Sequence, residues 1–315
     1  MKKIFATLAL TLATVTVSAQ QSVTYFRVQF SENLQQVATY GKDGKTFFNP
    51  AYDYLDFKGS LPFTHGSLSG NVDENAYYYI GNTPSDKTHF TLAKTDGSLA
   101  IKKVSAYSQP VQTITVTEEE GTYAVNGKKQ YTYTFNALPR NIEELKTLEV
   151  DNRKYFESQY FVTALFICCL NRIADNSADA WEMINYLRTH TATVGQNGIS
   201  LIANRDMQNI TESNLVGNDA NGFPKVNGLR SFFAGATPEN LYTPTTPYKV
   251  TVVEAAANPI LTENGITYAY LHVISGGADS AQGPLTLRKT NNHGWLLWTG
   301  ETMFTMSKKA QKEDL

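Results

Sequence analysis

The run Tyr160-Phe-Val-Thr-Ala-Leu-Phe-Ile-Cys-Cys-Leu170 is apolar on nearly every face of the helix that it would form. A helix that is hydrophobic all round is typical of the centre of a protein core. The run is too short to cross a bilayer, which takes about 20 apolar residues. It therefore predicts a buried central helix.

Two helices are predicted from the residues around this run. A short one covers Asn141–Leu148 and has two acidic residues in its first turn, where the helix dipole favours them. Asp151 has a side chain suited to an N-cap, so we expect a longer helix from there to about Ala174. The apolar run is the centre of that longer helix.

An amphipathic helix is expected next along the chain. Trp181, Ile184 and Leu187 recur at helical spacing and form an apolar stripe, which is typical of a face turned to the core. Ser177 is suited to cap this helix. Two further segments complete the region: a helix over Ile199–Met207 and an exposed loop over Gly217–Gly228.

Alternating apolar and polar residues predict strands on both sides of the helical region. Before it, the predicted strands are Ser22–Phe30, Ala76–Ile80, His89–Ala93, Ser98–Ile101, Gln112–Thr117 and Lys129–Phe135. After it, they are Tyr248–Val253, Thr267–Ile274, Pro284–Lys289 and Gly294–Trp298. Asn126-Gly127 favours a tight turn, so we expect a hairpin in which Glu118–Lys128 connects two strands.

The change from strand-like to helical composition at Leu138-Pro139 predicts two domains. Residues 20–138 would form an antiparallel β domain. Residues 139–300 would form an α+β domain, in which a helical layer packs on a C-terminal antiparallel sheet. Residues 301–315 are polar and lysine-rich, so we expect a frayed tail there. The predicted fold class is therefore α+β.

The first residues have the pattern of a secretory signal peptide. Lys2 and Lys3 precede an apolar stretch over Ile4–Val17, and Val17-Ser18-Ala19 supplies the small residues that signal peptidase requires. We expect residues 1–19 to be removed and the mature chain to begin at Gln20. The cleavage point has no cysteine, so a lipoprotein anchor is not expected. The predicted location is the periplasm or the extracellular space.

Composition argues against several classes of partner. The chain has 27 basic and 29 acidic side chains, a net charge of −2, so it lacks the basic excess of a nucleic-acid-binding protein. No later run is long enough for a membrane span. The only cysteines, Cys168 and Cys169, are adjacent and cannot form an ordinary disulfide with each other. We expect both to be buried in the core.

Motifs that would carry catalysis or hold a cofactor do not occur in the sequence. No phosphate-binding glycine loop is present. The histidines are scattered and do not form a compact metal-binding pattern: His65, His89, His190, His272 and His293. We therefore predict no catalytic residue, no metal and no cofactor.

Two loops are the best candidates for binding. The first, residues 230–248, contains three prolines and several aromatic residues, and the second, residues 275–284, contains a glycine pair beside polar residues. Each is also compatible with a purely structural role, as a crossing segment and as a hairpin connection. The candidate ligand-binding residues in and near these loops are Arg230, Tyr242, Asp279, Arg288 and Trp298. An arginine could receive an anionic ligand, and exposed aromatic rings could stack on sugar rings.

Several motifs in this order resemble an uncharacterised bacterial family whose domain has no known function. They include Met183-Ile-Asn-Tyr-Leu-Arg188, Arg230-Ser-Phe-Phe-Ala-Gly-Ala-Thr-Pro238, Ser275-Gly-Gly-Ala-Asp-Ser280 and Gly294-Trp-Leu-Leu-Trp298. The resemblance covers about residues 140–299. The chain departs from it at Ala281-Gln-Gly-Pro284, where the family pattern has Pro-Arg-Pro. The resemblance implies a fold and a kinship but no activity.

Three functions remain open on the sequence alone. The leading hypothesis is a secreted, non-catalytic protein that binds a ligand or a protein partner, because the chain has an export signal and no catalytic constellation. The second is a hydrolase whose site assembles from distant residues. The third is a structural component of the cell envelope.

Overall fold

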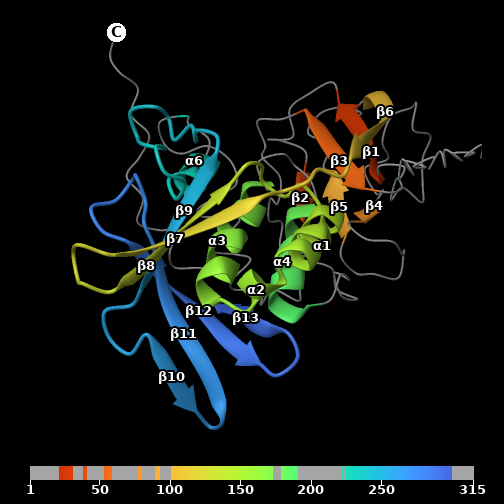
Figure 1. The fold of residues 1–315 in the computed structure, drawn as a ribbon. Helices are drawn as coiled ribbons and strands as arrows, with labels where there is room; N and C mark the ends of the chain where they lie inside the picture. Colours follow the sequence, from red (N-terminus) through yellow and green to blue (C-terminus); the bar gives the residue numbers. More distant parts are fainter. Residues whose placement is uncertain are drawn as a thin grey trace, which may run out of the picture.

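The computed structural model describes residues 21–30, 38–40, 53–58, 77–79, 89–92, 101–172, 179–190, 222 and 225–299. Small antiparallel sheets near the N-terminus are followed by a group of helices and a large antiparallel sheet (Figure 1). The predicted α+β fold class is therefore confirmed. No helix in these described ranges is both long and apolar enough to span a bilayer.

The N-terminal strands form two small sheets. The first has the order β3-β1-β6, with β1 at Ser22–Phe30, β3 at Tyr54–Lys58 and β6 at Ile101–Pro110. The second has the order β2-β5-β4, with β2 at Ala38–Tyr40, β4 at Tyr77–Tyr79 and β5 at His89–Leu92. The prediction of a strand that ends at Ile101 is wrong about its C-terminal end. Strand β6 begins at Ile101 and continues to Pro110.

The largest sheet in the part of the chain that the structure describes is antiparallel and has seven strands. Its main path has the order β13-β12-β11-β9-β8-β7, and β10 pairs with β11. The strands are β7 Val116–Thr122, β8 Lys129–Phe135, β9 Tyr248–Glu254, β10 Ile260–Glu263, β11 Ile266–Val273, β12 Gln282–Thr290 and β13 Gly294–Thr299. Because β8 pairs with β9 along Gln130–Phe135, this sheet extends across the boundary predicted at Leu138-Pro139.

The hairpin of β7 and β8 is shifted from its predicted position. The acidic segment Glu118–Glu120 lies within β7, paired with Tyr133 to Tyr131, and does not belong to the connection. The tight turn is at 123–128, where Gly127 has a positive φ of 67° that favours glycine. A run of like charges is usually a solvated turn, and for that reason the sequence predicts Glu118 and Glu120 in the connection.

The helices are α1 Ile142–Asp151, α2 Arg153–Phe156, α3 Gln159–Leu170, α4 Asp179–Thr189 and α6 Val226–Arg230. The prediction that Asp151 caps a long helix is wrong, since Asp151 ends α1 and Ser158 caps α3. Val226–Gly228 is helical rather than part of an exposed loop. Ser177, the helix predicted at 199–207 and the side chain of Trp181 lie outside what the structure describes.

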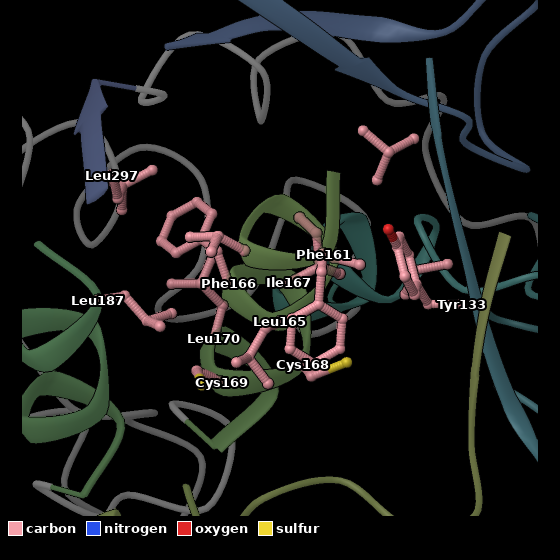
Figure 2. Close-up of a cluster of buried hydrophobic side chains, with 14 of the residues drawn as sticks. Tyr133, Phe161, Leu165, Phe166, Ile167, Cys168, Cys169, Leu170, Leu187 and Leu297 are labelled. Carbon is pink, nitrogen blue, oxygen red and sulfur yellow. The ribbon is translucent and has the colours of Figure 1, made fainter. Parts of the chain in front are cut away.

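Helix α3 lies at the centre of the core. All of its residues from Tyr160 to Leu170 are buried, as predicted, including Cys168 and Cys169. It contacts strands β8, β9, β11 and β13 and helices α2 and α4. Figure 2 shows Tyr133 on one side of α3 and Leu187 and Leu297 on the other.

The large sheet has two unlike faces. Along β11, Ala269, Leu271 and Val273 are buried against the helices, whereas Tyr268 and His272, on the opposite face, are only partly buried. Figure 1 shows α1 to α4 gathered on one side of the sheet. Antiparallel sheets commonly pack one face on the core and leave the other open. The face of β11 that carries Tyr268 is called the outer face below.

Candidate functional site

The two loops selected from the sequence pack directly against each other. The backbone N–H of Gly276 donates to the carbonyl of Ser231 at 2.7 Å. A Cβ at Gly276 would lie 2.0 Å from the carbonyl oxygen of Ala236, and one at Gly277 would lie 2.5 Å from the hydroxyl of Tyr242. The glycine pair is therefore needed for the close approach of the loop 275–284 to the segment 230–248.

A chain of buried hydroxyl groups reinforces this junction. The Ser275 hydroxyl donates to Ser231 Oγ at 2.8 Å, and the Ser231 hydroxyl donates to the carbonyl of Gly228 at 2.5 Å. The N–H of Gly277 donates in turn to Ser275 Oγ at 3.1 Å. Both serines are buried, and the bonds satisfy polar groups that water does not reach. The junction therefore has a structural function.

The five predicted binding residues do not form one site. Tyr242 is in the core, with 1% of its surface exposed, and burial followed by the charge of Glu239 raises its pKa to about 12. Arg230 ends α6, and its Nε donates to Asn171 Oδ1 at 3.4 Å beside the end of α3. Asp279 is exposed on the second loop. Arg288 and Trp298 are in direct contact on neighbouring strands.

Arg288, Trp298 and Tyr268 form a cluster on the outer face, called the β11–β13 platform below. The guanidinium carbon of Arg288 lies 4.5 Å from the centre of the Trp298 ring. Tyr268 is opposite Arg288 in the register of β11 and β12, and its ring centre lies 6.5 Å from that of Trp298. The sequence identified two of these residues but missed Tyr268, because cross-strand register is not a local pattern.

A break in strand pairing places Trp298 outward. Thr286 pairs with Thr299 and Leu287 pairs with Leu297, so Trp298 is the extra residue at a bulge. Bulges re-aim a side chain relative to the regular alternation of a strand. Trp298 is 40% exposed as a result, whereas Trp295 on the same strand is buried in the core.

Arg288 has an unused hydrogen-bonding donor. Its Nε is shielded from water and has no hydrogen-bond partner among the residues that the structure describes. In those residues it also forms no ion pair with a carboxylate, and its identified contact is with the ring of Trp298. Buried donors without a partner are uncommon in folded proteins, and each calls for an explanation.

A second polar cluster surrounds the buried carboxylate of Glu149, near the end of α1. The hydroxyl of Tyr186 donates to Glu149 Oε2 at 2.6 Å, and His190 Nε2 lies 3.0 Å from Oε1. The ring of His293 stacks on that of His190, with centres 4.1 Å apart. Burial, followed by the bond to Glu149, raises the pKa of the Tyr186 hydroxyl. Arg153 Nη1 lies 3.6 Å from Glu149 Oε1.

Sequence reasoning missed the Glu149 cluster, although part of it was visible. Tyr186 in α4 and His190 directly after its end are four residues apart, as are Glu149 in α1 and Arg153 in α2, and this is the spacing at which side chains meet along a helix. The meeting of the two helices with the turn that carries His293 is a tertiary feature. His190 has a positive φ of 58°, which is uncommon outside glycine.

The side chains that could bind a metal ion are not gathered in one place in the described part of the chain. Within it, no group of three or more histidine, cysteine or carboxylate side chains is arranged to hold a metal ion. Burial raises the pKa of both cysteine thiols, which disfavours the reactive thiolate form. The two cysteines are therefore core residues.

These features define an α+β protein whose large antiparallel sheet is packed with helices on one face and carries an aromatic and cationic cluster on the other. Residues 137–311 match the family described as Domain of unknown function (DUF6935). The match covers more than half of the chain, so the chain belongs to this family, and the predicted kinship with an uncharacterised family is confirmed at that level. No curated protein and no solved structure matches the chain.

Proposed function

We propose that this chain is an exported, non-catalytic binding protein and that the β11–β13 platform contacts its ligand or partner. The observation that carries the proposal is the contact of Arg288 with an indole ring that is 40% exposed, on the face of the sheet opposite the helices. Large aromatic side chains and arginine dominate the energetics of recognition surfaces. Strands of a sheet fix the backbone beneath them, which lowers the cost of ordering on binding.

The proposed export rests on the signal-peptide pattern of residues 1–19. Its test is the intact mass of the protein recovered from the periplasm or medium of a bacterial host. A mature chain beginning at Gln20 would support export. A full-length chain retained in the cytoplasm would contradict it.

The binding function is tested by a thermal-shift screen of residues 20–315 against glycans, peptides and small anions. A ligand at 100 times its Kd stabilises a protein by about 2.7 kcal/mol, which is readily measured. We expect at least one class to raise the midpoint of unfolding, and Trp298→Ala to abolish that rise. Ile260→Ala, at an exposed residue of β10, is the control that should keep it. The absence of a shift with every class would refute the proposal.

A hydrolase is the second candidate, and the Glu149 cluster is the observation that favours it. A histidine oriented by a carboxylate is one half of the arrangement that activates a nucleophile. The described contacts of His190 are with Glu149, Tyr186 and His293, so water would have to be the nucleophile. Hydrolysis of chromogenic esters or glycosides that is lost in His190→Gln, but kept in His272→Gln, would establish this activity over the first proposal.

A structural role in the cell envelope is the third candidate. It would place the outer face against another envelope protein. Retention of the protein in the envelope fraction, with no response in the thermal-shift screen, would support it against ligand binding.

A further inference from the structure

The β11–β13 platform has the chemistry to recognise an acidic sugar. This step rests on the binding function proposed above and concerns the class of ligand. We infer that the platform binds a glycan residue bearing a carboxylate, with the sugar ring against Trp298 and the carboxylate bonded to Arg288. The juxtaposition of an exposed indole with a guanidinium that forms no ion pair with a carboxylate in the described residues carries the inference.

The aromatic part of the platform suits a sugar ring. The face of an aromatic ring is electronegative, so it attracts the polarised C–H groups on the less polar face of a pyranose. Trp298 supplies such a surface, and Tyr268 lies 6.5 Å from it, centre to centre. Tyr270, two residues further along β11, shares the face of Tyr268. The phenolic hydroxyl groups of these tyrosines can donate to and accept from sugar hydroxyls.

The cationic part of the platform favours a negatively charged sugar over a neutral one. Arginine presents donors in a planar fork that matches a carboxylate. Arg288 forms no ion pair with a carboxylate that the structure describes, although the chain as a whole carries a net charge of −2. A carboxylate from a ligand would therefore supply the charge that the arginine lacks from the protein.

Two other classes of partner fit the same surface less well. Nucleic acid is held by several phosphate contacts at once, whereas the platform offers one arginine. A stable protein partner would need an interface of more than about 1,000 Å² in total. The exposed large apolar side chains of β11 and β13 are only Ile266 and Trp298. A protein partner is therefore an outcome of the test rather than the expectation.

The test uses pairs of glycans that differ only in charge. The mature chain would be titrated calorimetrically with sialyllactose against its methyl ester, and with trigalacturonate against its methyl ester. We expect one acidic member to bind at least about tenfold more tightly than its neutral counterpart, because hydrogen bonds between charged partners are the stronger ones. Trp298→Ala should abolish the binding of both members.

Variants of charged residues separate the carboxylate contact from ring stacking. Arg288→Gln should remove the preference for the acidic sugar while leaving weak binding of the neutral one. Lys249→Gln, at an exposed residue of β9, is the matched control and should keep the preference. Circular dichroism and thermal unfolding of each variant would show that the sheet is intact.

The outcomes distinguish this inference from the proposed function. Equal binding of acidic and neutral glycans, lost in Trp298→Ala, would overturn the acidic-sugar inference and leave the binding function standing. Binding of peptides alone in the thermal-shift screen would do the same and would identify a protein partner. The absence of binding by every class would overturn both.

Discussion

Gly276 and Gly277 show how a short motif can serve packing rather than binding. A glycine pair between two strands predicts only that the backbone comes close to something. The structure identifies the two neighbours as the carbonyl of Ala236 and the ring of Tyr242, both in the segment 230–248. The segment 230–248 and the loop 275–284 therefore pack on each other. Their motifs serve the fold, and a ligand-binding surface has to be looked for in another part of the molecule.

Gly276→Ala is expected to destabilise the fold. The new methyl group would lie 2.0 Å from a backbone oxygen, which cannot move as a flexible side chain can. Overpacking of this kind costs about 1–3 kcal/mol, or more where the backbone must shift. Urea denaturation measures the loss. Gly121→Ala is the control, since its nearest neighbour is the side chain of Gln130 at 3.3 Å, and it should change stability by less than about 0.5 kcal/mol. Equal stability of the two variants would contradict the packing role.

His272 is expected to make the fold sensitive to mild acid. Burial lowers the pKa of His272, and its ring lies against Gly283, where a Cβ would be 2.6 Å from Cδ2. The unfolded chain takes up a proton below about pH 6.5, and the folded chain does so only at lower pH. The stability due to the neutral ring is therefore fully present above pH 6.5 and is lost as the pH falls toward the folded pKa.

Urea denaturation at pH 7.5 and pH 5.0 measures this effect. His272→Gln should lose less stability between the two values than the parent chain does. Asn292→Ala, at an exposed residue of the β12–β13 turn that does not titrate, should behave like the parent in this respect. Equal losses in the parent and in His272→Gln would show that another group is responsible.

At the scale of single elements, the break between α2 and α3 has a tertiary cause. The sequence from Asp151 onward is compatible with one continuous helix, and the helix propensities of its residues support that prediction. In the structure, a Cβ at Gly294 would lie 2.9 Å from the carbonyl oxygen of Phe156, so the start of β13 touches the backbone where α2 ends. Ser158 then caps α3. A contact between residues so far apart in sequence is invisible to local patterns.

The carboxylate of Glu144, which is fully buried, joins helix α1 to the connection between β6 and β7. Both the N–H and the side-chain amide of Gln112 donate to it, at 3.1 and 2.9 Å. Arg140 donates to it from its guanidinium at 2.5 Å and from its backbone at 2.8 Å. The carboxylate thus fixes the connection between β6 and β7 to the first turn of α1.

Glu144→Gln is expected to lower the free energy of unfolding by about 3 kcal/mol, because it leaves Arg140 beside a neutral group at a buried site. Chemical denaturation of the variant measures the change. Glu143→Gln, one residue earlier in the same helical turn and only partly buried, is the control and should lose much less. A similar loss in both variants would mean that helix-dipole effects, and not the buried contacts, account for the result.

At the scale of the whole molecule, local patterns predicted the elements better than their pairing. The strands at 22–30 and 129–135 and the buried helix at 160–170 follow from alternation and from apolar content, and the structure confirms them. The pairing of β8 with β9 joins residues that are more than one hundred positions apart, and no local signal indicates it. The same limit explains why Arg288 and Trp298 could be selected from the sequence but not recognised as neighbours of Tyr268.

The sheet topology predicts where the chain can be cut. A fragment of residues 139–315 lacks β7 and β8, so β9 loses its partner β8 and becomes an edge strand, and the core loses Tyr133 and Phe135. Truncating a buried aromatic side chain costs about 3–5 kcal/mol, and a domain is stable by only about 5–15 kcal/mol. We expect this fragment to show no cooperative thermal transition by circular dichroism. A fragment of residues 112–315 keeps both strands and the contacts of Gln112 with Glu144, so it should unfold cooperatively. Cooperative unfolding of residues 139–315 would instead establish Leu138-Pro139 as a true domain boundary.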